Sequence, residues 1–263
     1  MQPVAASPVG AATLTWCVSV EPEGRPGDEN MAEDESLLGA ADRSGAAFLR
    51  LYRWSPPCLS LGRNEPALTR YDRAAIERLG LDVVRRPTGG RAVWHEHEVT
   101  YAVAAPIAAF GSLTESYRAI HERLARALRL LGVPASLAPR TRIPALDGRP
   151  GACFAAPVGG EVVVDGKKVI GSAQVRLGRA FLQHGSILLD GSQETVSAVS
   201  VQPSAVSSAT TLSAILGRPV GFGEVTDAIA STWGPPCPSP PVLARPCPPS
   251  SVRFSDPAWT WRR

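Results

Sequence analysis

RRPTGGRAVWHEHEVTY, residues 85–101, is the stretch around which the rest of the chain is organised. One strand, Leu81–Val84, is predicted to run into it, and a second, Ala92–Trp94, to leave it. Gly89 and Gly90 permit positive φ angles and the close approach of a ligand to the backbone. The arginines beside them suit an anionic or carbonyl-bearing ligand. The alternative is an ordinary hairpin with a solvated basic rim, because Gly-Gly pairs are common in turns.

The composition is that of a globular protein. Its 263 residues are 44% hydrophobic, which can supply the core of one large domain or two small ones. A net charge of +3 is too small to indicate a nucleic-acid partner. No apolar run approaches the ~18 residues of a membrane span, and no secretory leader is evident. We therefore expect a cytoplasmic protein without a membrane partner, and the five scattered cysteines indicate neither a zinc site nor a disulfide framework.

Local patterns divide the chain into three parts. Residues 1–12 have no period and are expected to be loose, whereas residues 13–233 carry helix and strand signals and form the predicted domain. Residues 234–263 are predicted to be a Pro-rich tail. Within them Pro235–Pro249 contains eight prolines, which argues against regular structure.

The strongest helix signal follows Ser112. Ser112 and Glu115 form a capping box, and apolar residues recur every three or four positions as far as Leu131. Further along, Asp165 and Gly166 have the composition of a two-residue hairpin turn. Helices and strands that are mixed without strict alternation favour an α+β fold.

Several motifs together resemble one known family. Residues 85–93, with His95, Thr100 and Tyr101, resemble the signature of the lipoate-protein ligase A and octanoyltransferase family, part of the biotin/lipoate attachment-enzyme superfamily. Further segments resemble the family in the same order: Asn30–Glu35, Trp54–Arg63, Asp165–Gln174 and Gln183–Leu189. The resemblance implies a catalytic domain of the biotin/lipoyl protein ligase type, similar to class II synthetases, in which helices flank a mixed sheet.

The resemblance also implies which residues bind substrate. They are Arg86, Thr88, Gly89, Gly90, Arg91, His95, Gly171, Ser172, Ala173, His184 and Gly185. We expect residues 85–91 and Lys168 to face one shared cleft, because motifs distant in sequence must converge on one acyl chain. Ala102 and Trp94 depart from the family pattern and could reshape the acyl pocket.

Cys153 is the predicted nucleophile. It lies among small residues beside a turn, where a thiol can be exposed as a nucleophile requires, although most single cysteines are merely buried small hydrophobes. Its position resembles that of the active-site cysteine in LipM-type octanoyltransferases, and ligases of the same fold lack it. The resemblance selects Lys168, not its solvated neighbour Lys167, as the partner that takes the thiol proton. That role needs a lowered lysine pKa, which we expect from an apolar strand with arginines nearby.

The other histidines have weaker signals. His95 and His97 share one face of an extended segment, which is a spacing found among metal ligands, but no third ligand accompanies them and we predict no metal site. His121 lies beside the apolar stripe of its helix and is predicted to be structural. For His184 the sequence leaves open whether it reacts or only forms hydrogen bonds with a neighbouring loop.

The leading hypothesis is a cysteine-dependent octanoyltransferase of lipoate biosynthesis. It would move an octanoyl group from acyl carrier protein, through a thioester on Cys153, to a lysine of a lipoyl domain. Expected acceptors are the glycine cleavage H protein or the E2 component of 2-oxoacid dehydrogenases. Exchange between thioesters is nearly isoenergetic, and covalent capture splits one transfer into two easier steps, so no cofactor is expected.

Two alternatives stay open. An ATP-dependent lipoate-protein ligase would use the same bend and Lys168 to hold an acyl-adenylate, with ATP and Mg²⁺ as cofactors and Cys153 incidental. A non-catalytic acyl- or carrier-binding module would need neither Cys153 nor Lys168, and the presence of both argues against it.

Overall fold

The computed structural model describes residues 14–139, 159–202, 209–234 and 248–262. Its strands are β1 (Trp16–Arg25), β2 (Ala47–Trp54), β3 (Cys58–Leu61), β4 (Asp82–Arg85), β5 (Val93–His95), β6 (Glu98–Pro106), β7 (Ser136–Leu137), β8 (Val162–Val164), β9 (Lys167–Lys168), β10 (Ile170–Leu177) and β11 (Ala180–Leu188). Its helices are α1 (Gly27–Ser44), α2 (Ala67–Arg70), α3 (Arg73–Arg78), α4 (Leu113–Leu130), α5 (Glu194–Ala198), α6 (Leu212–Leu216), α7 (Phe222–Trp233), α8 (Pro248–Ser255) and α9 (Pro257–Thr260), with a 3₁₀ turn η1 (Ile107–Ala109). Within the described ranges, no helix is long and apolar enough to cross a membrane.

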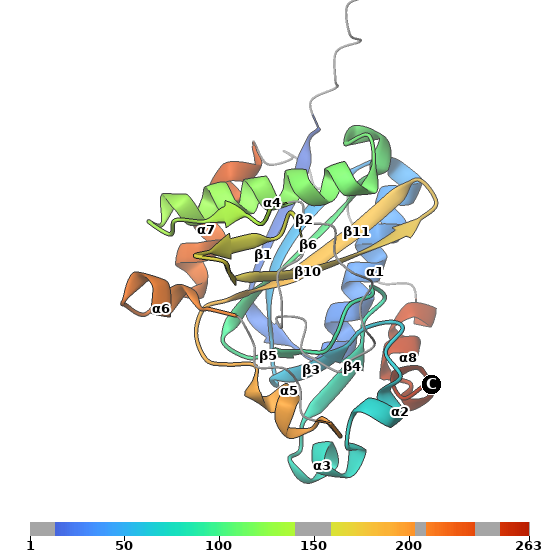
Figure 1. Ribbon diagram of the computed structural model, residues 1–263. Helices are drawn as coiled ribbons and strands as arrows, with labels where there is room; N and C mark the ends of the chain where they lie inside the picture. Colours follow the sequence, from blue (N-terminus) through green and yellow to red (C-terminus); the bar gives the residue numbers. More distant parts are fainter. Residues whose placement is uncertain (1–13, 140–158, 203–208, 235–247, 263) are drawn as a thin grey trace, which may run out of the picture.

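A five-stranded sheet forms the centre of the molecule, with the strand order β1-β2-β6-β11-β10 (Figure 1). β1 and β2 are parallel and the other neighbours are antiparallel, so the sheet is mixed. Two three-stranded sheets have the orders β4-β3-β5 and β7-β8-β9. The mixed sheets and their flanking helices confirm the predicted α+β fold.

β6 is the middle strand of the large sheet, and the sequence analysis did not predict it. Its first eight residues, from Glu98 onward, are buried. A strand that is covered on both faces lacks the polar–apolar alternation by which a half-buried strand is recognised. Its small residues Ala102 and Ala104 lie in the core that α1 covers, and they let that helix lie close to the sheet.

The two faces of the large sheet have separate cores. On one face α1 contributes Met31 and Leu37. On the other face α4 contributes Leu124 and Leu128, and α7 contributes Ile229. Figure 1 shows α1 and α4 on different sides of the sheet. Because successive strand residues point to opposite faces, each strand supplies both cores.

Two predicted local structures are confirmed. Ser112 caps α4: its hydroxyl accepts from the backbone N–H of Glu115 at 3.1 Å and donates to the Glu115 carboxylate at 2.6 Å. Asp165 and Gly166 join β8 to β9, with φ angles of 48° and 73°. Positive φ at both central residues is the conformation of a two-residue hairpin turn.

The C-terminal segment is more ordered than the predicted Pro-rich tail. Residues 235–247 lie outside the described residues, but α8 and α9 follow them and pack near α1 and β4. Phe254 of α8 is 1% exposed and belongs to the core of α1. Trp259 of α9 donates its indole N–H to the carbonyl oxygen of Arg85 at 3.0 Å. Proline is tolerated in the first turn of a helix, as Pro257 is in α9, so a proline-rich composition did not exclude these short helices.

Candidate active site

Arg86 shapes the loop that follows β4. Its guanidinium donates to the carbonyl oxygens of Gly89 at 3.1 Å and Arg91 at 2.8 Å, on either side of the bend. It also donates to the carbonyl and hydroxyl oxygens of Ser60, both at 2.7 Å. Gly90 has a φ of 92°, which a side chain would strain. Arg86 therefore holds the Gly-Gly bend in place with its own hydrogen bonds.

Arg85 also donates its hydrogen bonds to the protein backbone. Its Nη1 donates to the carbonyl oxygens of Gly62 and Glu65, both at 2.8 Å, and its Nε to that of Thr260 at 2.9 Å. Its Nη2 donates to the carbonyl oxygen of Arg262 at 3.2 Å. Burial, with Arg262 nearby, lowers the pKa of Arg85 to about 10. The sequence suggested that these arginines suit an anionic or carbonyl-bearing ligand. In the structure, the guanidinium groups of Arg85 and Arg86 donate to carbonyl groups of the chain.

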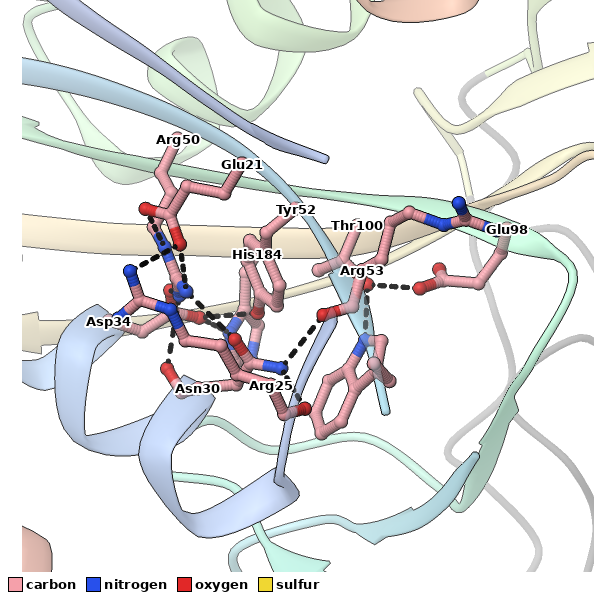
Figure 2. A network of polar contacts seen from close by, with 11 residues as sticks. Glu21, Arg25, Asn30, Asp34, Arg50, Tyr52, Arg53, Glu98, Thr100 and His184 are labelled. Atoms are coloured by element: carbon pink, nitrogen blue, oxygen red, sulfur yellow. Dashed lines mark hydrogen bonds and ion pairs between the residues drawn. The ribbon is translucent and has the colours of Figure 1, made fainter. Parts of the chain in front are cut away.

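His184, on β11, connects this loop to α1, and Figure 2 shows the side of this connection at Asp34. Its Nε2 lies 2.6 Å from the Thr88 hydroxyl, and its Nδ1 lies 2.8 Å from the Asp34 carboxylate. An ionised carboxylate only accepts, so Nδ1 carries the proton and Nε2 accepts from Thr88. All three side chains are buried. Asp34, His184 and Thr88 form a relay that fixes the loop from the sheet side.

Asp34 is held by two further donors. Arg50 donates to its Oδ1 at 3.0 Å, and Tyr52 to its Oδ2 at 2.9 Å. Arg50 also forms two hydrogen bonds with Glu21, each 2.9 Å long. Burial opposes the charge of Arg50, but Glu21 and Asp34 raise its pKa above the ordinary value. Burial and the charge of Asp34 raise the pKa of Tyr52, so its phenol stays protonated as a donor.

His95 is a neutral ring in the same region. It stacks on Trp54 with ring centroids 4.1 Å apart, and its Nε2 lies 2.6 Å from the Ser60 hydroxyl. Burial lowers the pKa of His95. Its Nδ1 is buried and lies 3.5 Å from Glu98 Oε1, which is longer than an ordinary hydrogen bond. A weakly paired polar atom of this kind is available to a bound molecule.

These groups surround a cavity of about 330 Å³ that is partly open to solvent. Seven predicted site residues line it: Arg86, His95, Gly171, Ser172, Ala173, His184 and Gly185. The rest of its wall consists of Met31, Tyr52, Trp54, Val93, Thr100 and Ser186. Thr88, Gly89, Gly90 and Arg91 form the adjoining loop and not the wall. This volume includes space that is open to solvent.

Gly185 is required by packing. A Cβ atom there would lie 2.6 Å from the hydroxyl oxygen of Ser172 and 2.8 Å from a ring carbon of Tyr101. The Tyr101 and Ser172 hydroxyls are themselves hydrogen-bonded at 2.6 Å. Any larger residue at position 185 would push this pair apart at the cavity wall.

Lys168 lies outside the wall of this cavity. Its ammonium is 2.8 Å from Glu161 Oε1, and both side chains are 2% exposed. Tyr117 of α4 donates to the same oxygen at 3.2 Å, so the ammonium lies toward α4. The sequence analysis predicted one cleft shared by Lys168 and residues 85–91, with arginines near the lysine. Lys168 is not among the residues that line the cavity, and it forms an ion pair with a carboxylate.

His121 links Lys168 to the cavity wall. Its Nε2 lies 2.8 Å from the Ser172 hydroxyl, and its Nδ1 lies 2.8 Å from the carbonyl oxygen of Gly160. Burial, with a smaller contribution from the charge of Lys168, lowers the pKa of His121 to about 3. This buried, hydrogen-bonded position agrees with its structural interpretation.

Two further predictions concern the nucleophile and a metal site. Cys153, the predicted nucleophile, lies outside the described residues. Among the residues that are described, no group of three or more His, Cys, Asp or Glu side chains could hold a metal ion. His97 is largely exposed and lies 3.8 Å from Glu96.

Sequence reasoning missed the residues that support the relay. Asp34 lies in a segment quoted only for its family resemblance, and its partner Tyr52 lies in β2. A signal was present: Arg50 interrupts the apolar residues of β2, and a charge inside an apolar strand needs partners. Those partners could not be named, because His184 is 150 positions from Asp34.

Comparison with known proteins agrees with this geometry. The family described as lipoyl protein ligase A/B catalytic domain matches residues 26–234. An octanoyltransferase LipM from Kyrpidia tusciae is 43% identical over 220 residues, covering 76% of this chain and 80% of the relative. An octanoyltransferase LipM from Symbiobacterium thermophilum is 39% identical over 222 residues, covering 79% and 81%.

Solved structures share the fold. A lipoate-protein ligase A bound with ATP superposes with a TM-score of 0.67 at 22% identity, covering 84% of this chain and 83% of the other. A bipartite lipoate protein ligase from Thermoplasma acidophilum gives a TM-score of 0.70 at 20% identity, covering 94% and 96%. Fold and sequence agree that this chain belongs to the lipoyl protein ligase A/B catalytic-domain family.

Proposed function

We propose that this chain is a protein octanoyltransferase of lipoate biosynthesis. It takes an octanoyl group from acyl carrier protein and transfers it, through a thioester on Cys153, to a lysine of a lipoyl domain such as that of the glycine cleavage H protein or a dehydrogenase E2. The observation that carries the proposal is the identity of 38–46% to relatives named octanoyltransferase LipM.

The cavity supports an uncharged acyl chain as its occupant. Apolar groups such as Met31, Trp54 and Val93 contribute to its wall. Of its polar members, His95 and Tyr52 are neutral, since burial lowers the pKa of the first and raises that of the second. The guanidinium of Arg86 donates to oxygen atoms of the chain. Each methylene buried there contributes about 0.8 kcal/mol to binding.

The chemistry proceeds in two balanced steps. In the first, the Cys153 sulfur attacks the thioester carbonyl, its proton passes to Lys168, and the carrier thiol leaves with a proton. In the second, the lysine amine of the lipoyl domain attacks the Cys153 thioester, an amide forms, and the Cys153 thiol is regenerated. Neither step consumes ATP or a cofactor.

For Lys168 to take the thiol proton, its ammonium first has to lose a proton and leave Glu161. Lys168 lies next to His121, which is hydrogen-bonded to Ser172 in the cavity wall. The path from Lys168 to the cavity therefore runs past two side chains on the α4 side of the sheet, His121 and Ser172.

Intact mass spectrometry tests the proposal. Mixing the protein with octanoyl-acyl carrier protein, without nucleotide, is expected to add the mass of one octanoyl group to the enzyme. Cys153→Ala is expected to abolish the adduct and the transfer together, and Cys153→Ser to impair both severely, because a hydroxyl is a far weaker acid.

An ATP-dependent ligase is the second candidate, since solved structures with this fold include lipoate protein ligases. It predicts no adduct, a tolerated Cys153→Ala substitution, and ATP–pyrophosphate exchange with octanoate or lipoate. A Cys153→Ala variant with the wild-type rate would reject the transferase.

A further inference from the structure

A line of arginines connects the C-terminal segment to the loop beside the cavity. Arg262 and Arg85 both donate to the carbonyl oxygen of Arg63. Arg85 in turn donates to the carbonyl oxygen of Arg262 and precedes Arg86, which lines the cavity. Arg253 and Arg262 both lie against the ring of Trp259, at 4.3 Å and 4.0 Å from its centroid. Five guanidinium groups are thereby gathered on one side of the molecule.

The outer members of this line lie at the rim of the cavity. The backbone N–H of Arg63 donates to the carbonyl oxygen of Thr88 at 2.7 Å. A Cβ atom on Gly62 would overlap the carbonyl oxygen of Gly90, so the two loops are in direct contact. Gly90 is exposed, and a Cβ atom on it would lie 3.7 Å from that of Ala173 in the cavity wall. The exposed side chain of Arg63 is therefore placed beside the loop that borders the cavity.

The positive charge of this rim is only partly balanced within the described residues, where Arg253 forms an ion pair with Glu35. No carboxylate side chain among them forms an ion pair with Arg63 or Arg262, and the nearby Glu65 is engaged by Tyr71 at 2.7 Å. Burial, together with the charges of Arg63 and Arg253, lowers the pKa of Arg262. Like charges brought together in this way repel one another, and an anionic partner would relieve the repulsion.

We propose that Arg63 and Arg262 form the docking face for an acidic surface of the acyl-loaded carrier protein, so that the C-terminal segment helps to build the donor side of the site. The proposal rests on the proposed function, because a thioester that enters this cavity places its carrier over the rim. A macromolecular acid fits better than a free anion, since the two guanidiniums come from separate segments and Arg63 is exposed.

A binding measurement tests the docking face without chemistry. The dissociation constant of octanoyl-acyl carrier protein is measured for the full chain and for the double variant Arg63→Glu/Arg262→Glu. Reversing two interface charges is expected to weaken binding roughly tenfold or more, and to flatten the dependence of binding on salt. Arg118→Glu/Arg126→Glu, on the exposed side of α4, makes the same change in net charge and is the matched control, with an expected change below about twofold.

Turnover measured with two acyl donors then shows whether the rim variant affects carrier binding or the chemical step. The rim variant is expected to raise KM for octanoyl-acyl carrier protein and to leave the rate with octanoyl-N-acetylcysteamine, an uncharged small thioester, unchanged. Arg63→Ala, a milder change at an exposed position, is expected to show a smaller rise in the same KM and guards against misfolding of the double variant.

Equal dissociation constants for the rim and control variants would overturn the docking face, as would a selective rise in KM for the lipoyl-domain acceptor. Binding of ATP that is weakened by the rim variant, with carrier binding unchanged, would assign the arginines to a nucleotide instead. If the wild-type protein binds the carrier through the rim but transfers nothing from either donor, the proposed function fails and the docking face stands.

Discussion

Two polar networks meet the cavity from opposite faces of the central sheet, and they differ in how their charges are arranged. The α1-side network joins Asp34, Arg50 and Glu21 to His184, and its Asp34 carboxylate accepts from three side chains. The α4-side network has one buried ion pair, Lys168–Glu161. The first is cross-linked and suited to positioning the loop, whereas the second centres on one ion pair.

The difference suggests that neighbouring strand positions serve different networks. In β10 and β11, Ala173 pairs with His184 and Ser172 pairs with Gly185. Successive residues point to opposite faces, so one pair faces the α1 network and the next faces the α4 network. The cavity wall thus has a rigid side next to the α1 network. Its other side is next to the α4 network, which holds the proposed proton-transferring group, Lys168.

Breaking the α4-side pair is expected to have the largest effect. Lys168→Ala should lower the rate of acyl transfer by about 10²–10⁴-fold, the usual contribution of a general base, while carrier binding stays close to wild type. Because Lys168→Ala removes the cationic partner of the buried Glu161, Lys168→Met/Glu161→Gln is the control: it should fold and remain inactive. A loss under tenfold in both variants would remove Lys168 from the chemistry.

Breaking the α1-side network is expected to affect stability first. Asp34→Ala leaves the buried Arg50 with Glu21 as its remaining acidic partner and removes the acceptor of His184, so unfolding free energy should fall by about 3–5 kcal/mol. Denaturant titration measures the loss. Asp34→Asn keeps the shape and should lose less, and if both variants cost under about 1 kcal/mol the network is not the rigid element described above.

The pH dependence of the unfolding free energy tests the comparison further, with a smaller effect per pH unit. The pKa of His121 is lowered to about 3 in the folded protein, so the unfolded chain binds its proton more readily below the ordinary value of 6.5. Stability is therefore lost as pH falls from about 6.5 toward 3, by up to about 1.4 kcal/mol per pH unit. His121→Gln cannot titrate and should show a shallower decline; identical slopes for both proteins would contradict the assignment.

Local signals predicted the parts of the fold that local chemistry determines. The Ser112 capping box and the Asp165-Gly166 turn are made by residues next to each other in sequence, and both were predicted correctly. The strand β6 was missed because burial on both faces removes its period. The predicted α+β class did not depend on it.

The sequence predicted which residues line the site but not which residues they contact. Seven residues that the family resemblance selected do line one cavity. The partners of Arg85 and Lys168 were not foreseen, since Thr260 and Glu161 come from elsewhere in the chain and no periodicity points to them. Whether Cys153 approaches the cavity remains a prediction.

The attachment of Arg85 to the C-terminal segment has a consequence for biosynthesis. The carbonyl group of Thr260 that accepts from Arg85 belongs to a residue 175 positions further along the chain. At a synthesis rate of about 5–20 residues per second, the ribosome needs on the order of 10–30 seconds to make those residues. During that interval the Nε and Nη2 atoms of Arg85 lack their acceptors on Thr260 and Arg262, whereas the acceptors of Nη1 on Gly62 and Glu65 are already made. Maturation of the nascent chain into a competent acyl site must therefore lag behind the appearance of its signature loop.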